Sequence, residues 1–360
     1  MRFTDDFNIS RAVKIWLITG LVMIFFQIII GGVTRLTGSG LSITRWEIVT
    51  GSIPPLNEAD WISEFELYKQ TPQYQKINQG MTVGEFKFIY FWEYFHRLWA
   101  RLMFFVFVIP FAWFLWRGML SRRLLPRMLT VVALAGLEGF FGWAMVASGL
   151  IKRPWVNAYN LTLHLCMALV IFAYLLWTWF LTISPKLPDF SSRRFRRFAW
   201  FIFGVAFFQI ALGAIMSGSK AGLFFPTWPD MNGEYLPAVL FDSSHWTADS
   251  FIHYDTNPFM PALIQFLHRN TAYLLTVMVL YFVWKIFPAH SGTSQEKISP
   301  ILRRSGWWLM AAVGAQVLLG IFTVINCKAK VPVDLGVAHQ AGAVVLLSMI
   351  LWVSFQLRKK

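Results

Sequence analysis

Residues 93–116, EYFHRLWARLMFFVFVIPFAWFLW, decide the fold, because they form a long apolar run that begins with four polar side chains. A bilayer core about 30 Å thick is crossed by roughly 20 apolar residues of helix, so this run can span a membrane. Ionisable side chains at membrane depth are unfavourable unless they serve a site or a partner, and here they are Glu93, His96, Arg97 and Arg101. The run therefore predicts a membrane helix with functional groups near one end.

Seven further runs predict seven more membrane helices. The chain has 360 residues, is 56% hydrophobic and 14% charged, and contains 18 Trp and 35 Phe, which is unlike a soluble domain. The predicted spans are 12–33, 93–116, 126–149, 161–183, 197–217, 266–287, 304–325 and 336–356. The first is too long for the core of a signal peptide, so we expect it to be retained. The sequence predicts an all-α integral membrane protein with eight transmembrane helices.

The basic residues follow the spans and do not suggest a nucleic-acid partner, although the net charge is +14. They gather on one side, at Arg2, Arg11, Lys14, Arg117, Arg122, Arg123, Arg127, Lys186, Arg193, Arg194, Arg196, Arg197, Lys285, Lys297, Arg303, Arg304, Arg358, Lys359 and Lys360. The positive-inside rule assigns that side to the cytoplasm. We therefore expect a protein of the cell inner (plasma) membrane, in contact with lipid, with both termini cytoplasmic. The long connections 34–90 and 218–264 would lie outside and fold as lids or short helices.

The second half of the chain repeats the first. FFQIIIGGV at 25–33 matches FFQIALGAI at 207–215, and EYFHRLWARL at 93–102 matches QFLHRNTAYL at 265–274. LEGFFGWAMV likewise matches AQVLLGIFTV, and LTLHLCMALVIF matches LGVAHQAGAVVLL. An even number of spans gives both copies one orientation, so we expect two tandem four-helix bundles related by a pseudo-twofold axis along the membrane normal. The predicted halves are 1–185 and 186–360.

Four histidines, His96, His164, His268 and His339, are predicted in the first turns of the spans that run from outside to inside. They would therefore lie at one depth near the outer surface, two in each half. Two imidazoles from facing helices, in an aromatic lining, suit the two axial positions of a haem iron. Each histidine alone could simply mark the membrane interface, but four in repeat register favour two haem sites.

Zinc is the main alternative metal. A zinc site would need a third or fourth nitrogen, sulfur or oxygen ligand in each half, and no such ligand repeats. The two cysteines, Cys166 and Cys327, are far apart in the sequence and are expected to be packing residues.

Arg97 and Arg269 directly follow two of the histidines. They could bind haem propionates, because arginine forms bidentate contacts with carboxylates, or they could anchor helix starts at lipid head groups. Arg101 has no counterpart in the second half, and a propionate or head-group contact is the only role we can suggest for it.

The halves differ at two acidic positions. Glu93 lies one helical turn before His96, where the second half has Gln265, and Glu138 stands where the second half has Gln316. A carboxylate beside an iron can move protons or position water, whereas an amide can only form hydrogen bonds. This predicts that the first half does chemistry and the second holds a haem permanently. Glu93 could instead face water at the interface, and Glu138 could be protonated, paired or functional.

These motifs, together with GGVTRLTGSGLS and VAHQ, make the chain resemble the haem A synthase family over essentially its whole length. It is similar to the mitochondrial and Gram-negative branch, which lacks a cysteine pair in the first outer loop. Two positions depart from the family pattern: Ala100, where Gly is usual, and Glu138, where Gln is usual. The resemblance implies an oxidoreductase that converts a methyl group of haem O, through hydroxymethyl, to the formyl group of haem A.

The resemblance also implies roles for the site residues. His268 and His339 would be the axial ligands of a resident haem b, His96 and His164 would hold the substrate haem O, and Glu93 would be the catalytic acid. Expected partners are haem O synthase, the cytochrome oxidase assembly machinery and an unidentified electron donor, and a homo-oligomer stays open. Two other functions fit the bundles equally well: a di-haem subunit that oxidises quinol, and a haem transporter or chaperone.

Overall fold

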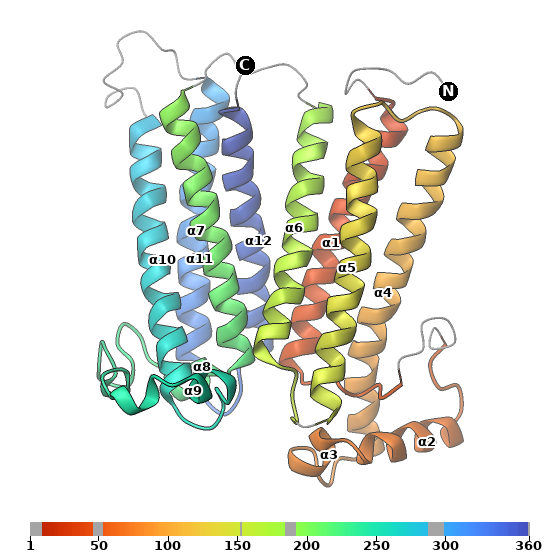
Figure 1. Cartoon of the computed structure of the whole chain (residues 1–360), viewed down its shortest axis with the longest axis vertical. Coiled ribbons are helices and arrows are strands. Elements are labelled where there is room, and N and C mark those ends of the chain that lie inside the picture. The colour runs from red at the N-terminus through yellow and green to blue at the C-terminus, as the bar shows by residue number, and fades with distance from the viewer. Residues whose placement is uncertain (1–8, 46–52, 152, 184–191, 287–298, 359–360) are drawn as a thin grey trace.

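The computed structural model describes residues 9–45, 53–151, 153–183, 192–286 and 299–358, and these residues are almost entirely helical. Eight of the helices are long and apolar enough to cross a membrane and stand side by side (Figure 1). They are α1 (Arg11–Leu36), α4 (Val83–Trp116), α5 (Leu124–Ile151), α6 (Ala158–Ile183), α7 (Arg193–Gly218), α10 (Phe259–Ile286), α11 (Pro300–Ile325) and α12 (Val333–Gln356). The prediction of an all-α, multi-pass membrane protein is confirmed. The predicted boundary between residues 185 and 186 lies outside the described residues.

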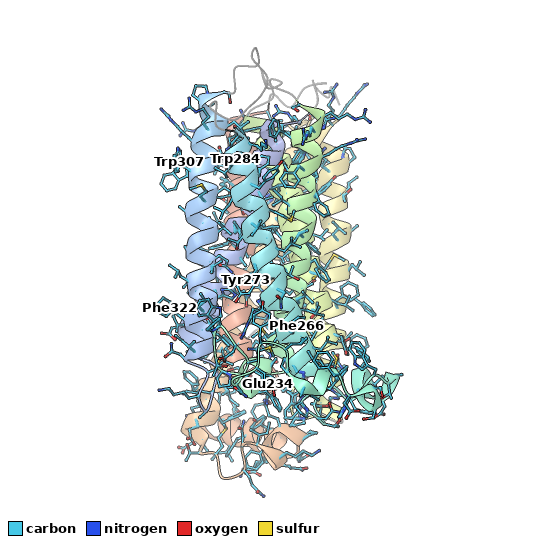
Figure 2. The ribbon with its side chains drawn as sticks, turned by 90° about the vertical axis from the view of Figure 1, so that its left-hand side faces the viewer. Glu234, Phe266, Tyr273, Trp284, Trp307 and Phe322 are labelled. Atoms are coloured by element: carbon cyan, nitrogen blue, oxygen red, sulfur yellow. The ribbon has the colours of Figure 1, made fainter. Side chains whose placement is uncertain are left out.

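The start of α1 and the end of α12 lie at the same end of the molecule (Figure 1). Near that end the exposed side chains of Trp284 and Trp307 project from α10 and α11, while Phe266, Tyr273 and Phe322 lie toward the other end (Figure 2). Tryptophan and tyrosine prefer the two membrane–water interfaces, because their rings are apolar and carry one polar atom. The placement fits helices that cross a bilayer along their length.

All eight membrane-spanning helices begin before the predicted residue, and α4 and α10 do so by more than a few residues. The Thr82 side chain and Glu85 form a reciprocal capping box, so α4 begins at Val83 rather than at residue 93. Helix α10 begins at Phe259 rather than at residue 266. The prediction that every cavity histidine lies in the first turns is therefore wrong for His96 and His268, since further helical turns precede the predicted runs.

The second half is a closed ring of four helices. Helix α7 packs against α10, α10 against α11, α11 against α12, and α12 against α7. In the first half α1 packs against α4 and α6, and α5 packs against α6. Helices α4 and α5, whose backbones are described throughout, do not pack together as their counterparts α10 and α11 do. One side of the first half is therefore open.

The two halves meet in the middle of the molecule through contacts of α6 with α7, α1 with α12, and α6 with α12. Buried side chains such as Leu17, Leu175, Val279 and Leu347 belong to one continuous apolar core across both halves. The halves therefore form one packed body, and the pseudo-twofold axis stays a prediction.

Short helices cover the end opposite the chain termini, as the sequence predicts for the long connections (Figure 1). The first connection holds α2 (Glu58–Lys69) and α3 (Pro72–Lys76), and the second holds α8 (Ala221–Phe224), α9 (Ala248–Ile252) and two 3-10 turns. The α2 helix is attached to α4 through a cluster of buried rings, including Phe65, Tyr68 and Phe86. Burial raises the pKa of the Tyr68 hydroxyl to about 12, and Asn78 donates a 2.7 Å hydrogen bond to it. The neutral hydroxyl thus helps to hold the first connection, with α2 and α3, in place; this connection is called the first lid below.

Candidate functional site

One cavity runs between the helices, and residues from all eight spans line it. Its volume is about 1540 Å³, which exceeds the roughly 300–1,000 Å³ of ordinary ligand pockets. The four predicted histidines, His96, His164, His268 and His339, all lie on its wall. The fold therefore brings together side chains from both halves of the chain.

The rings of His268 and His339 lie close together. Their ring centroids are 6.4 Å apart and the ring planes are inclined by 78°. Two metal–nitrogen bonds of about 2 Å each, plus the two ring radii, give a separation of about 6 Å. The separation of the two rings therefore matches that of two imidazoles that ligate one metal ion.

Each cavity histidine lies against a glycine of the preceding long helix. A methyl group added to Gly31, Gly142, Gly213 or Gly320 would come within 2.9 to 3.1 Å of the Cε1 atom of the facing histidine. Contacts of this length are shorter than normal van der Waals contact, so any larger residue would push the ring away. The four glycines therefore make room for the four imidazoles.

The same helices supply a polar partner for each imidazole, one turn before the glycine. The amide nitrogens of Gln27, Gln209 and Gln316 lie 3.4, 3.3 and 3.1 Å from a ring nitrogen of His96, His268 and His339. The fourth partner is Glu138, whose carboxylate lies 3.1 Å from Nδ1 of His164. Sequence reasoning matched these residues between the halves only. It missed that Gln or Glu followed four positions later by Gly occurs in all four odd-numbered spans.

The donor set fits haem iron better than zinc. The Nδ1 atoms of His96 and His268 are buried and have no hydrogen-bond partner among the described residues, so they are available to a ligand. Across the described part of the chain, no group of three or more His, Cys, Asp or Glu side chains could hold a metal ion. Two imidazoles per half match the axial positions of haem, whereas zinc requires more protein ligands.

Glu93 is buried and holds the first outer connection over the cavity. Its Oε2 accepts hydrogen bonds from the backbone and hydroxyl of Ser42, at 2.7 and 2.8 Å, and from the backbone of Ile43, at 2.9 Å. Its Oε1 forms a 2.6 Å ion pair with Arg97, which also donates to the carbonyls of Ile43 and Arg45. The acid and the arginine therefore act together on one loop.

Gln265 and Arg269 hold the second outer connection in the same way. The Gln265 amide donates a 2.6 Å hydrogen bond to the carbonyl of Phe225, and Arg269 donates to the carbonyls of Thr227, Pro229 and Asp230. The change from Glu to Gln thus has a structural correlate, since the first loop presents N–H donors and the second presents a carbonyl acceptor. Both arginines also line the cavity, so their predicted propionate contact stays a prediction.

Arg101 also lines the cavity, and both cysteines are free thiols. Cys327 is buried and its Sγ lies 3.2 Å from the carbonyl of Thr323. Neither thiol lies in a group that could ligate a metal among the described residues, and the packing role predicted for them stays the simplest one.

Comparison with known proteins identifies the family of the chain. A family model described as COX15-CtaA, cytochrome oxidase assembly protein, matches residues 14–351. The chain is 42% identical over 350 residues to a protein named heme A synthase from Rhodospirillum centenum, covering 97% of this chain and 89% of that protein. Proteins of the same name from Bradyrhizobium diazoefficiens and Nitrosomonas eutropha are 40% and 39% identical, covering 94% and 95% of this chain, and 89% and 92% of those proteins. The chain therefore belongs to the cytochrome oxidase assembly family that contains the haem A synthases.

Proposed function

We propose that this chain is a haem A synthase, an oxidoreductase that converts a methyl group of haem O through hydroxymethyl to the formyl group of haem A. The family and the names of its relatives support this reaction. The chain's own support is a cavity large enough for porphyrins with two imidazoles in each half and no third metal ligand among the described residues.

The two halves have different roles in this proposal. Residues 1–185 bind the substrate haem O through His96 and His164, and residues 186–360 hold haem b permanently through His268 and His339. The observation that carries this assignment is the packing of the helices, because α10 closes against α11 while α4 and α5 leave the first half open. A lipid-soluble substrate must enter and leave its site, whereas a resident cofactor need not.

Residues on the open side support this route. Phe104 and Phe105 of α4 and Val132, Gly136 and Gly139 of α5 are exposed to the outside and also line the cavity. An exposed apolar lining that continues into a cavity suits an apolar ligand arriving from lipid. Haem O would enter here from the membrane, and haem A would leave by the same opening.

Glu93 is the catalytic acid of this proposal. When bound, haem b supplies one-electron transfer, and the protein must hold the substrate and move protons. The Glu93 carboxylate lies on the cavity wall under the first lid, fixed by Ser42, Ile43 and Arg97, where it can exchange protons between the cavity and the outer side. Arg97 and Arg269 are proposed to contact the propionates while they hold the lids.

The orientation and partners follow from the same scheme. The chain lies in the inner membrane with cytoplasmic termini, and its haem sites are near the periplasmic side. Haem O synthase supplies the substrate, the cytochrome oxidase assembly machinery receives the product, and an electron donor completes the cycle.

Pigment analysis tests the proposal. The protein is purified from its membrane, the pigments are extracted and separated by chromatography, and the pure protein is then given haem O. We expect haem b together with haem O or haem A, and formation of haem A from added haem O. Haem b in both sites would instead support a quinol-oxidising subunit, and free exchange of both haems without oxidation would support a transporter.

A further inference from the structure

Arg35 is a cation on the cavity wall with few partners. It lies near the outer end of α1, and its Nη2 donates a 2.7 Å hydrogen bond to the carbonyl of Ser217 in the last turn of α7. Its Nη1 and Nε have no partner among the described residues, and Nε is buried. A guanidinium carries five N–H donors, and removing it from water is unfavourable unless an anion compensates. The protein alone therefore leaves Arg35 incompletely paired.

The position of Arg35 is one helical turn beyond the layer of histidines. Arg35 follows Gly31 by one turn, and Ser217 follows Gly213 by one turn, and both glycines pack against histidine rings. At 1.5 Å per residue, one turn places the Cα atom of Arg35 about 6 Å further toward the outer mouth than that of Gly31. Because Arg35 belongs to α1 and bonds to α7, it also lies where the two halves meet.

Lys220 is a second cation at this point. It follows α7, lines the same cavity, and its Nζ lies 4.0 Å from the centre of the Trp155 ring. Burial lowers the pKa of Lys220, and the nearby charge of Arg35 lowers it further. The carboxylate of Asp255 acts on Lys220 in the opposite direction, but it lies 3.5 Å from Arg153. The acid that acts on Lys220 thus already has a partner of its own, Arg153.

We propose that Arg35 and Lys220 bind the propionate carboxylates of the porphyrins that the histidines hold, which rests on the proposed haem function. Propionate arms project from the porphyrin edge, away from the iron, so they require cations displaced from the histidine layer along the helices. The guanidinium fork matches a carboxylate, and the ammonium adds a point charge. Arg97 and Arg269, which are proposed above to contact propionates as well, donate some of their N–H groups to the backbone of the lids.

The test compares haem b with its dimethyl ester, in which both carboxylates are blocked. Each porphyrin is titrated into the full-length, haem-depleted protein in detergent, and binding is followed through the Soret band. Wild type should bind the free acid more tightly than the ester. In Arg35→Gln and in Lys220→Gln the affinity for the free acid should fall roughly tenfold or more, while the affinity for the ester changes little.

Lys328→Gln is the matched control, because Lys328 is an exposed cation at the same end of the molecule and does not line the cavity. It should keep the wild-type preference for the free acid. Arg35→Lys should keep part of the preference, and it serves as the second variant if Arg35→Gln does not fold. The inference is overturned if Arg35→Gln and Lys220→Gln both discriminate between acid and ester as wild type does.

Two further variants identify the porphyrin concerned. His96→Ala leaves only the second histidine pair intact, and His268→Ala leaves only the first. If one of these variants still prefers the free acid to the ester, Arg35 and Lys220 bind the propionates of the porphyrin held by its intact pair. If wild type bound haem b without the Soret spectrum of two-histidine ligation, the proposed function would be contradicted. An unchanged spectrum without an acid preference would contradict only the role of Arg35 and Lys220.

Discussion

The Glu138 carboxylate lies 3.1 Å from Nδ1 of His164, whereas the other three cavity histidines have glutamine amides at the equivalent place. A carboxylate beside a ligating imidazole fixes the ring and makes it a stronger donor to the metal than an amide does. The first histidine pair is therefore built differently from the second, at a position where the two halves of the sequence differ.

Exchange of the two side chains tests this difference. Glu138→Gln should raise the midpoint potential of a haem bound in the first half, because a weaker imidazole donor stabilises ferric iron less. Gln316→Glu should lower the potential of the haem in the second half for the same reason. Redox titration followed by electron paramagnetic resonance measures both. Unchanged potentials in both variants would show that the carboxylate has no influence on the iron.

Glu93→Gln should abolish haem A production and leave the haem b content unchanged. The amide oxygen can still accept hydrogen bonds from Ser42 and Ile43, but the ion pair with Arg97 and the exchangeable carboxyl proton are lost. Haem content and haem A yield are measured by pigment extraction.

Ser42→Ala is the control that separates the catalytic role of Glu93 from its role in holding the first outer connection. It removes one hydroxyl hydrogen bond to Glu93, keeps the backbone ones, and should retain most of the haem A yield. Normal haem A production by Glu93→Gln would remove Glu93 from the mechanism.

Gly213→Ala should reduce the haem b content. The new methyl group would lie 3.0 Å from Cε1 of His268, so the ring must move from its place between the helices. Gly314→Ala is the matched control, since its methyl group would meet nothing within 4 Å, and it should stabilise α11 by at most about 1 kcal/mol. Haem per protein, measured optically, distinguishes the two variants, and equal content in both would contradict the close-packing argument.

Gly136→Phe should hinder passage through the opening between α4 and α5. Gly136 faces open space, lines the cavity and lies on the unpacked side of α5. We expect a higher KM for haem O, with normal haem b content, because the bulky ring narrows the entrance only. The repeat-equivalent Gly314→Phe lies on the closed half and should alter neither quantity. An unchanged KM in Gly136→Phe would argue against entry at this side.

Hydrophobic run lengths were enough to find all eight spans, because a bilayer imposes the same length on every crossing helix. The place of His96 within its helix was misjudged, because α4 begins at the capping box of Thr82 and Glu85, well before the predicted run. The glycine contacts were within reach of the sequence. Gly31 and Gly142 follow Gln27 and Glu138 at the same spacing, but only the duplication between halves was compared.

The sequence by itself determined the membrane fold, the internal repeat, the four cavity histidines and the family, because these depend on composition, period and motif. Tertiary structure alone decided that Glu93 and Arg97 form an ion pair at the first outer connection and that Glu138 lies beside His164. It also decided that Arg35 donates a hydrogen bond to α7 of the other half. It also decided that one half is closed and the other open. Such contacts join segments far apart in the chain, and helix packing brings them together in a way that no local pattern records.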